Sequence, residues 1–135
     1  MEQVKKKKVK AVIASKDAPR AIGPYSQGIL AGNVLFCSGQ IPINPKTGAL
    51  VRGSIEEQTH QVLDNLGAVL REAGMDYCDV VSVTVLMDDM DNYARINRVY
   101  AEYFNEHPPA RCAAAVTRLP KDAAVEISFI AIRME

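Results

Sequence analysis

Apolar residues in the first part of the chain lie in short runs that turn-forming residues separate. Residues 9–14 form a β-type run that ends in a loop rich in proline and glycine. Two more runs follow at residues 29–31 and 34–38. Only Gly32 and Asn33 separate them, which is typical of a tight hairpin. The pattern therefore predicts three strands in this part of the chain.

Helical spacing replaces this pattern after Ser54. Ser54 and Glu57 have the spacing of a capping box at a helix N-terminus. Gly74 is a typical C-terminal stop signal. Between these signals, apolar residues recur at helical spacing, at Val62, Leu63, Leu66, Val69, Leu70 and Ala73. The sequence therefore predicts one amphipathic helix in the middle of the chain.

Strand-like alternation returns after Gly74. The apolar members of this alternation are Val81, Val83, Val85 and Met87. The acidic segment at residues 88–92 then supplies capping residues for a second helix. The face of that helix includes Tyr93, Ile96, Tyr100, Tyr103 and Phe104. Pro108 and Pro109 end it, and two short apolar strands joined by a polar turn close the chain.

These elements follow in the order βββαβαββ, which predicts an α+β fold with about six strands and two helices. Two helices can cover only one face of such a sheet. The last strand nevertheless carries apolar side chains on both faces, with Val125, Ile127 and Phe129 on one and Ile130 and Ile132 on the other. We therefore expect another copy of the chain to cover the second face, which gives a symmetric homo-oligomer.

Length and charge narrow the range of partners. The chain has 135 residues, and its 16 basic residues balance its 16 acidic residues, which argues against nucleic acid as the main partner. We expect residues 1–8, with their lysine run, to form a flexible basic segment before a single domain at residues 9–135. No apolar run has the ~20 residues of a membrane span, and no signal peptide is recognisable. We therefore expect a cytoplasmic protein without a membrane partner.

Metal chemistry has little support in the sequence. Cys37, Cys78 and Cys112 show no CxxC spacing, and only two histidines are present. These residues form no recognisable zinc ligand set, and unpaired cysteines are typical of a reducing compartment. We therefore expect no metal site.

Two charged residues interrupt the apolar strands at the end of the chain. Arg111 opens the first strand, and Glu126 lies between Val125 and Ile127 in the second. A charge in an apolar strand is costly unless it is paired or hydrogen-bonded, so such residues either hold the structure together or meet a ligand. Arginine binds a carboxylate through two parallel hydrogen bonds, and a half-buried glutamate can move protons. The pair indicates a site for a small carboxylate.

Four separated segments occur in the order found in a known family. They are AIGPYSQG (21–28), FCSGQIPINPKTG (36–48), MDNYARINRVYAEYF (90–104) and PPARCAAAVTRLPKDAAVEI (108–127), and they resemble the RidA/YjgF family of reactive-intermediate deaminases. The resemblance implies a chorismate-mutase-like α+β fold and a homotrimer with sites between subunits. It also implies hydrolysis of enamine and imine acids, such as 2-iminopropanoate and 2-iminobutanoate, to 2-oxo acids and ammonia. No cofactor is required for that chemistry.

The resemblance assigns roles residue by residue. Arg111 falls on the arginine that binds the substrate carboxylate, and Glu126 on the glutamate that orients or deprotonates the attacking water. Tyr25 falls on a tyrosine that lines the cleft, while Ser38 and Gly39 fall on a segment that lies against the ligand. Apart from the resemblance, a strand-end ion pair would explain Arg111, a structural ion pair would explain Glu126, and packing would explain Tyr25.

Further positions carry a role or depart from the family pattern. Asn97 falls on a helix position that faces the site, although the sequence alone places it on a helix surface. Ala113 stands where many relatives have cysteine, and we expect backbone N–H groups there to support the ligand. Strand alternation turns Cys112 to the opposite face from Arg111, so we expect no thiol nucleophile. Ser128 replaces a second glutamate that relatives often carry, a change expected to affect the substrate range.

Three other functions compete with imine hydrolysis. A non-catalytic, chaperone-like trimer could use the same residues to bind small carboxylates. RNA cleavage is a second alternative, but the balanced charge and the lack of tryptophan argue against it. Chorismate mutase activity is a third, although a dicarboxylate is expected to need more than one cationic contact, and fold does not decide function.

Overall fold

The computed structural model describes residues 10–134; the lysine run and the domain boundary expected at residue 9 lie outside the described residues. The strands are β1 (Lys10–Ile13), β2 (Gly28–Ala31), β3 (Val34–Gln40), β4 (Val80–Met87), β5 (Ala110–Ala115) and β6 (Val125–Ile132). The helices are α1 (Ile55–Glu72) and α2 (Tyr93–Tyr103), with short 3-10 turns η1 (Tyr77–Asp79), η2 (Met90–Asn92) and η3 (Pro120–Asp122). The chain order confirms the predicted βββαβαββ arrangement.

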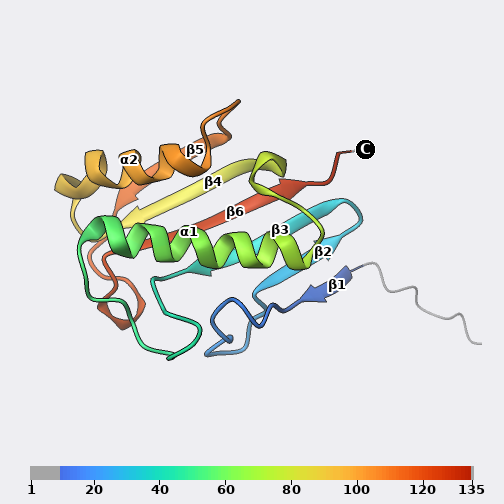
Figure 1. Ribbon diagram of the computed structural model, residues 1–135, viewed down its shortest axis with the longest axis horizontal. Helices are drawn as coiled ribbons and strands as arrows, with labels where there is room; N and C mark the ends of the chain where they lie inside the picture. The colour runs from blue at the N-terminus through green and yellow to red at the C-terminus, as the bar shows by residue number, and fades with distance from the viewer. Residues whose placement is uncertain (1–9, 135) are drawn as a thin grey trace, which may run out of the picture.

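The strands form one six-stranded sheet in the order β1-β2-β3-β6-β4-β5. Neighbouring strands are antiparallel except β4 and β5, which are parallel because α2 connects them. Both helices pack on one face of the sheet (Figure 1), as predicted. Among residues 10–134, neither helix is long and apolar enough to cross a membrane. The last two strands are not neighbours, since β4 lies between β5 and β6.

The main core lies between the helices and the sheet. Alternate residues of β6 point into it, namely Val125, Ile127, Phe129 and Ala131. The buried face of α1 supplies Leu63, Leu66, Val69 and Leu70. Burial of each large apolar side chain of this kind stabilises the fold by about 1.5–3 kcal/mol. The strong alternation along β6 leaves its remaining residues, Glu126 among them, on the second face.

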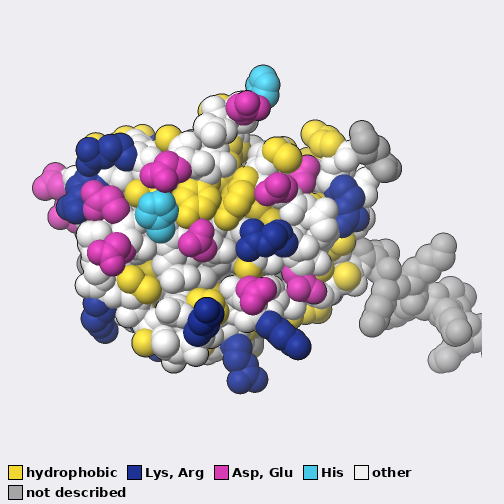
Figure 2. Space-filling model, viewed as in Figure 1, with side chains coloured by type: hydrophobic (Ala, Val, Ile, Leu, Met, Phe, Trp, Pro, Cys, Tyr) yellow, Lys and Arg dark blue, Asp and Glu magenta, His cyan; other side chains and the backbone are white. Residues whose placement is uncertain are grey.

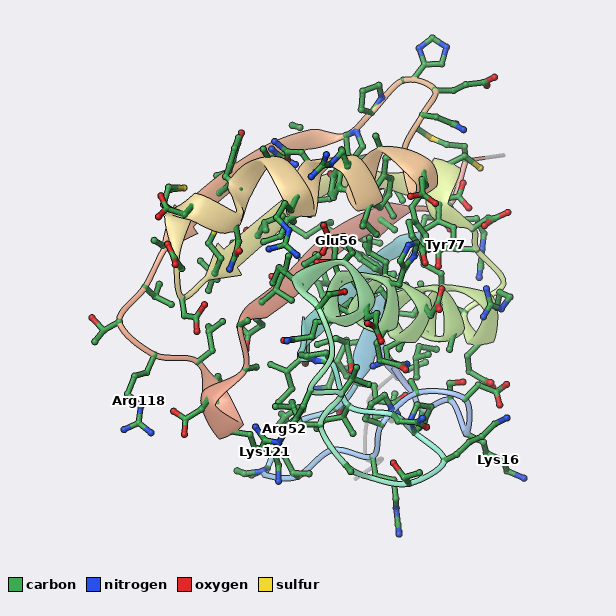
Figure 3. The ribbon with its side chains drawn as sticks, turned by 60° about the vertical axis from the view of Figure 1, so that its left-hand side comes forward. Lys16, Arg52, Glu56, Tyr77, Arg118 and Lys121 are labelled. Carbon is green, nitrogen blue, oxygen red and sulfur yellow. The ribbon has the colours of Figure 1, made fainter. Side chains whose placement is uncertain are left out.

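Helix α1 begins and ends as predicted. The Glu57 N–H donates to Ser54 Oγ at 3.1 Å, and the Ser54 N–H donates to the Glu57 carboxylate at 3.3 Å, which completes the capping box. Gly74 takes a left-handed φ of +73° after the last turn. Near the start of α1, where Figure 3 labels Glu56, two hydrogen bonds from Arg95 of α2 to the Glu56 carboxylate join the helices and lower the pKa of Glu56 to about 2.

Two local predictions need correction. Val81 does not join the buried side of β4, because the pairing of β4 with β6 shifts at its start and buries Val80 instead. The acidic segment before α2 does not cap that helix. The Asp89 carboxylate accepts a hydrogen bond from the Asp91 N–H at 2.9 Å and so caps η2, whereas Asn92 makes no side-chain bond at the start of α2.

The second face of the sheet carries apolar side chains, and neither α1 nor α2 covers it (Figure 1). A row of cross-strand partners, formed by Val12, Ile29, Phe36 and Ile130, crosses four strands. Val12 is 64% exposed and Phe36 is 48% exposed. At one end of the sheet, a smaller core of Ile41, Ile43, Leu119 and Ala123 packs against Leu86. The exposed row is the kind of surface that a second copy of the chain would cover.

Candidate active site

The loop between β1 and β2 carries Tyr25 and is held by the buried side chain of Gln27. The Gln27 Oε1 accepts a hydrogen bond from the Ser15 N–H at 2.6 Å, and its Nε2 donates to the Pro19 carbonyl at 2.8 Å. The Tyr25 hydroxyl in turn accepts a hydrogen bond from the Ile22 N–H at 3.3 Å. Because buried polar groups are costly when unpaired, these bonds fix the loop and place the Tyr25 ring beside β3.

A β-bulge shapes the end of β3. Its pairing with β6 shifts between Cys37 and Gln40, so one extra residue is inserted where Ser38 and Gly39 lie. The Ser38 hydroxyl donates to the Ser26 carbonyl at 2.6 Å and joins the bulge to the Tyr25 loop. Bulges are frequent beside functional sites because they change the direction of nearby groups. The bulge brings Gly39 under a side chain of β6.

That side chain is Glu126, which lies on the second face of the sheet, directly over Gly39. A Cβ atom at Gly39 would lie 2.8 Å from both Cδ and Oε2 of Glu126, so any other residue there would force the carboxyl group to move. Burial raises the pKa of Glu126 above its ordinary value of 4.5. Within residues 10–134, Glu126 takes part in no ion pair. The structural ion pair that would explain Glu126 is therefore absent from the described residues.

A cavity of about 380 Å³ opens beside this carboxyl group. It is lined by Ile22, Tyr25, Ser38, Gly39, Pro120 and Glu126. Four of the residues predicted from the sequence therefore meet at one place. We call Tyr25, Ser38, Gly39 and Glu126 the glutamate half-site.

Replacing Gly39 by alanine tests this arrangement. The new methyl group would push the Glu126 carboxyl aside, and displacement of a catalytic group by ~1 Å can cost about a hundredfold in rate. We expect a large loss of activity. The midpoint of thermal unfolding should change little, because the displaced carboxyl is the mobile end of a side chain. Gly53→Ala is the matched control. A Cβ atom at Gly53 would lie 2.7 Å from Cδ of Glu57, so this variant also displaces a carboxyl group, but neither residue lines the cavity. Equal activity of both variants would contradict the assigned geometry.

Arg111 lies elsewhere, at the start of β5. Its Nη2 donates to the Tyr93 hydroxyl at 2.9 Å. Its guanidinium carbon lies 4.7 Å from the ring centroid of Tyr100 and 5.5 Å from that of Tyr93, so both rings attract the cation. In the described part of the chain Arg111 forms no ion pair with a carboxylate, so the strand-end ion pair is absent there.

Asn97 belongs to the surroundings of Arg111. Its side chain lies near the Tyr93 hydroxyl, and together with the Arg111 guanidinium it lowers the pKa of Tyr93. The Tyr100 hydroxyl is buried without a hydrogen-bond partner among the described residues. We call Tyr93, Asn97, Tyr100 and Arg111 the arginine half-site.

Sequence reasoning missed both tyrosines of the arginine half-site. It assigned Tyr93 and Tyr100 to the apolar face of α2, but Tyr93 is 39% exposed and bonded to Arg111. Tyr93, Asn97 and Tyr100 follow one another at intervals of four and three residues, so they lie on the same side of a helix. This spacing could have indicated that all three face β5.

The two half-sites do not meet within one chain. Arg111 pairs in register with the buried Val83, so it lies on the helix-covered face. Glu126 pairs with Leu86 on the second face, and β4 separates the two strands. Among residues 10–134, strand β5 is also an edge strand with a neighbour on one side only, so it leaves backbone groups for a ligand or another chain.

Residues 112 and 113 follow strand alternation. Cys112 points away from Arg111, as predicted, and its Sγ lies 3.7 Å from Thr84 Oγ1. It therefore shares the second face with Glu126. The Ala113 side chain packs against the main core, so only its backbone could reach a ligand. The buried Cys37 has a pKa raised to about 12 by burial and is no nucleophile at neutral pH.

Comparison with known proteins gives this geometry a family context. Residues 15–133 match the family model described as Endoribonuclease L-PSP. A RutC family protein of Pyrococcus horikoshii is 55% identical over 125 residues, which cover 93% of this chain and 99% of the relative. The 2-iminobutanoate/2-iminopropanoate deaminase of Escherichia coli K12 is 46% identical over 124 residues, covering 90% and 96%.

The fold comparison agrees. A crystal structure of a Rid family protein from Yersinia pestis matches with a TM-score of 0.90 and 49% identity, and the match covers 92% of this chain and 99% of that one. No group of three His, Cys, Asp or Glu side chains within residues 10–134 could hold a metal ion. The matched model, the identity to relatives and the fold together show that the chain belongs to the RidA/YjgF family.

Proposed function

We propose that the protein hydrolyses 2-imino acids and their enamine tautomers, including 2-iminopropanoate and 2-iminobutanoate, to 2-oxo acids and ammonia. The observation that carries this proposal is that Arg111 is held in place without a carboxylate partner among residues 10–134. Its guanidinium is held by Tyr93 and Tyr100. A positioned arginine of this kind is suited to bind the carboxylate of a small acid through two parallel hydrogen bonds.

The proposed reaction needs position, one water molecule and a route for protons. Arg111 holds the carboxylate, so that C2 of the imine lies near Glu126. The Glu126 carboxylate accepts a proton from water while the water oxygen bonds to C2, and it passes this proton to the imine nitrogen. The resulting carbinolamine then transfers its hydroxyl proton, again through Glu126, to the nitrogen as the C–N bond breaks, so that ammonia leaves and C2 becomes the carbonyl of the 2-oxo acid. The Tyr25 hydroxyl lies where it can hydrogen-bond the water or the substrate.

The complete site is proposed to form between two copies of the chain, in a homotrimer. One copy supplies the glutamate half-site and its neighbour supplies the arginine half-site. Two features support this arrangement: the exposed apolar row on the second face and the unpaired outer edge of β5. A cyclic trimer repeats the same contact three times and closes the assembly.

A coupled assay tests the proposed activity. A threonine dehydratase releases the imine of 2-oxobutanoate, and added semicarbazide traps what is not yet hydrolysed. We expect this protein to hasten 2-oxobutanoate release and to reduce the trapped adduct. A non-catalytic carboxylate-binding trimer would bind 2-oxobutanoate through Arg111 without changing either rate, and that result would overturn the proposal.

The family description names an endoribonuclease, so RNA cleavage belongs in the same experiment. On the helix face, basic and acidic side chains are interspersed rather than gathered into a basic stripe (Figure 2). RNA-binding surfaces need the opposite arrangement. Ribonuclease activity that co-purifies with the protein and survives Arg111→Ala would favour RNA cleavage instead.

A further inference from the structure

A second cavity extends from the glutamate half-site. It has a volume of about 220 Å³, apolar walls formed by Pro19, Ile22, Ile43 and Pro45, and the cationic residues Arg20 and Lys121. A hollow of about 50 Å³ links the two regions, since its lining includes Arg20 and Ile22 of this cavity and Gly39 and Glu126 of the glutamate half-site. We call this extension the side cavity.

The two cations of the side cavity are not neutralised within residues 10–134. Neither Arg20 nor Lys121 takes part in an ion pair there. The carboxylate next in sequence, Asp122, accepts hydrogen bonds from Arg118 at 3.0 and 2.7 Å and is thereby occupied. Among the residues lining the side cavity, the connecting hollow and the glutamate half-site, Glu126 is the only acidic one. The side cavity therefore has an unbalanced positive charge.

The position of Lys121 is built into the fold. Lys121 has a left-handed φ of +56° and Asp122 one of +55°, a conformation that costs free energy at residues other than glycine. The turn η3 is held on both sides, because Leu119 and Ala123 are buried in the smaller core. Figure 3 shows Lys121 at this turn and Arg118 in the segment just before it, at the end of the molecule opposite the C-terminal end of α1. Such a turn presents its lysine from a fixed backbone.

We propose that the side cavity receives the substrate side chain and selects 2-imino acids that carry a second carboxylate, such as 2-iminoglutarate. This inference rests on the proposed function. The methylene groups of the side chain would contact the walls formed by Ile22 and Ile43, and the distal carboxylate would lie between Arg20 and Lys121. The reaction is the same hydrolysis: 2-iminoglutarate and water give 2-oxoglutarate and ammonia.

The test compares two imines formed in place by amino-acid oxidases, one from glutamate and one from alanine. Arg20→Gln and Lys121→Gln remove each charge while keeping a long polar side chain. Each variant is expected to lower kcat/KM for 2-iminoglutarate about tenfold, as loss of one charged hydrogen bond predicts. Activity on 2-iminopropanoate is expected to stay within about twofold, since that substrate has no distal carboxylate. Lys16→Gln is the matched control, because Lys16 is exposed, lines none of these cavities and lies apart from Lys121 in Figure 3.

Each outcome decides the inference. Equal losses on both imines, or no loss on 2-iminoglutarate, would overturn it while leaving the proposed function intact. A wild-type protein that hydrolyses 2-iminopropanoate but not 2-iminoglutarate would overturn it in the same way. If the wild-type protein accelerates neither reaction, the proposed function itself fails and the substrate assignment fails with it. Thermal unfolding of each variant confirms that the fold is retained.

Discussion

Replacing Arg111 by alanine is expected to lower kcat/KM for 2-imino acids by about a hundredfold to a thousandfold. Loss of one partner of a desolvated, hydrogen-bonded charge pair costs about 2–5 kcal/mol, and the substrate carboxylate would lose both of its hydrogen bonds. The chain is expected to stay folded, because within residues 10–134 Arg111 contributes one hydrogen bond, to Tyr93, and two ring contacts. Initial rates and thermal unfolding measure the two effects separately.

Two further variants make this result specific. Arg111→Lys keeps the charge but not the planar pair of donors, so about a tenfold loss should remain. Arg98 on the same helix as Tyr93 is the matched control, because its only ion pair within residues 10–134, with Glu56, is 4.0 Å long and exposed. Arg98→Ala should retain wild-type activity. If the Arg111→Ala protein were as active as the wild type, that result would contradict the carboxylate-binding role of Arg111.

Replacing Glu126 by glutamine is expected to reduce kcat by about a hundredfold to ten-thousandfold, the range found for loss of a general base. Glutamine keeps the size of the side chain over Gly39 but cannot accept the proton of water. In the wild type, activity should fall at low pH with a midpoint above 4.5, because burial raises the pKa of this carboxyl. Glu126→Gln should abolish that midpoint. If the residual activity of the variant keeps the same midpoint, the midpoint belongs to another group.

The same raised pKa predicts a change in stability with pH. The folded chain holds the Glu126 proton more tightly than the unfolded chain, in which the pKa of this carboxyl is near 4.5. This contribution to the free energy of unfolding is complete below 4.5 and is lost as pH rises through the folded pKa. Glu126→Gln should therefore flatten the stability profile just above pH 4.5, as urea unfolding at a series of pH values would show. Identical profiles would mean that the carboxyl is not buried.

Local features of the fold follow from the sequence because their causes are local. The Gly32-Asn33 hairpin and the capping box of Ser54 depend on neighbouring residues only, and both are confirmed. The cap of α2 is predicted wrongly because η2 intervenes, and Asp89 caps that short turn instead. Alternation along β6 correctly places Glu126 on the face opposite the core.

The relation between Arg111 and Glu126 depends on strand order, which sequence periodicity does not contain. Only the placement of β4 between β5 and β6 shows that the two residues lie on opposite faces. The bulge that brings Gly39 under Glu126 is likewise a feature of pairing between distant segments. Motif resemblance pointed to Gly39 as well as to Arg111 and Glu126, whereas physical reasoning from the sequence alone reached only the two charged residues.

A site shared between copies can be tested by mixing two inactive proteins. Arg111→Ala chains still carry a complete glutamate half-site, and Glu126→Gln chains still carry a complete arginine half-site. When equal amounts are unfolded and refolded together, random assembly should pair the two intact half-sites in about one quarter of the clefts. We therefore predict about a quarter of wild-type activity from the mixture, with native mass spectrometry confirming mixed oligomers. Mixed oligomers that remain as inactive as either variant alone would contradict a site built from two chains.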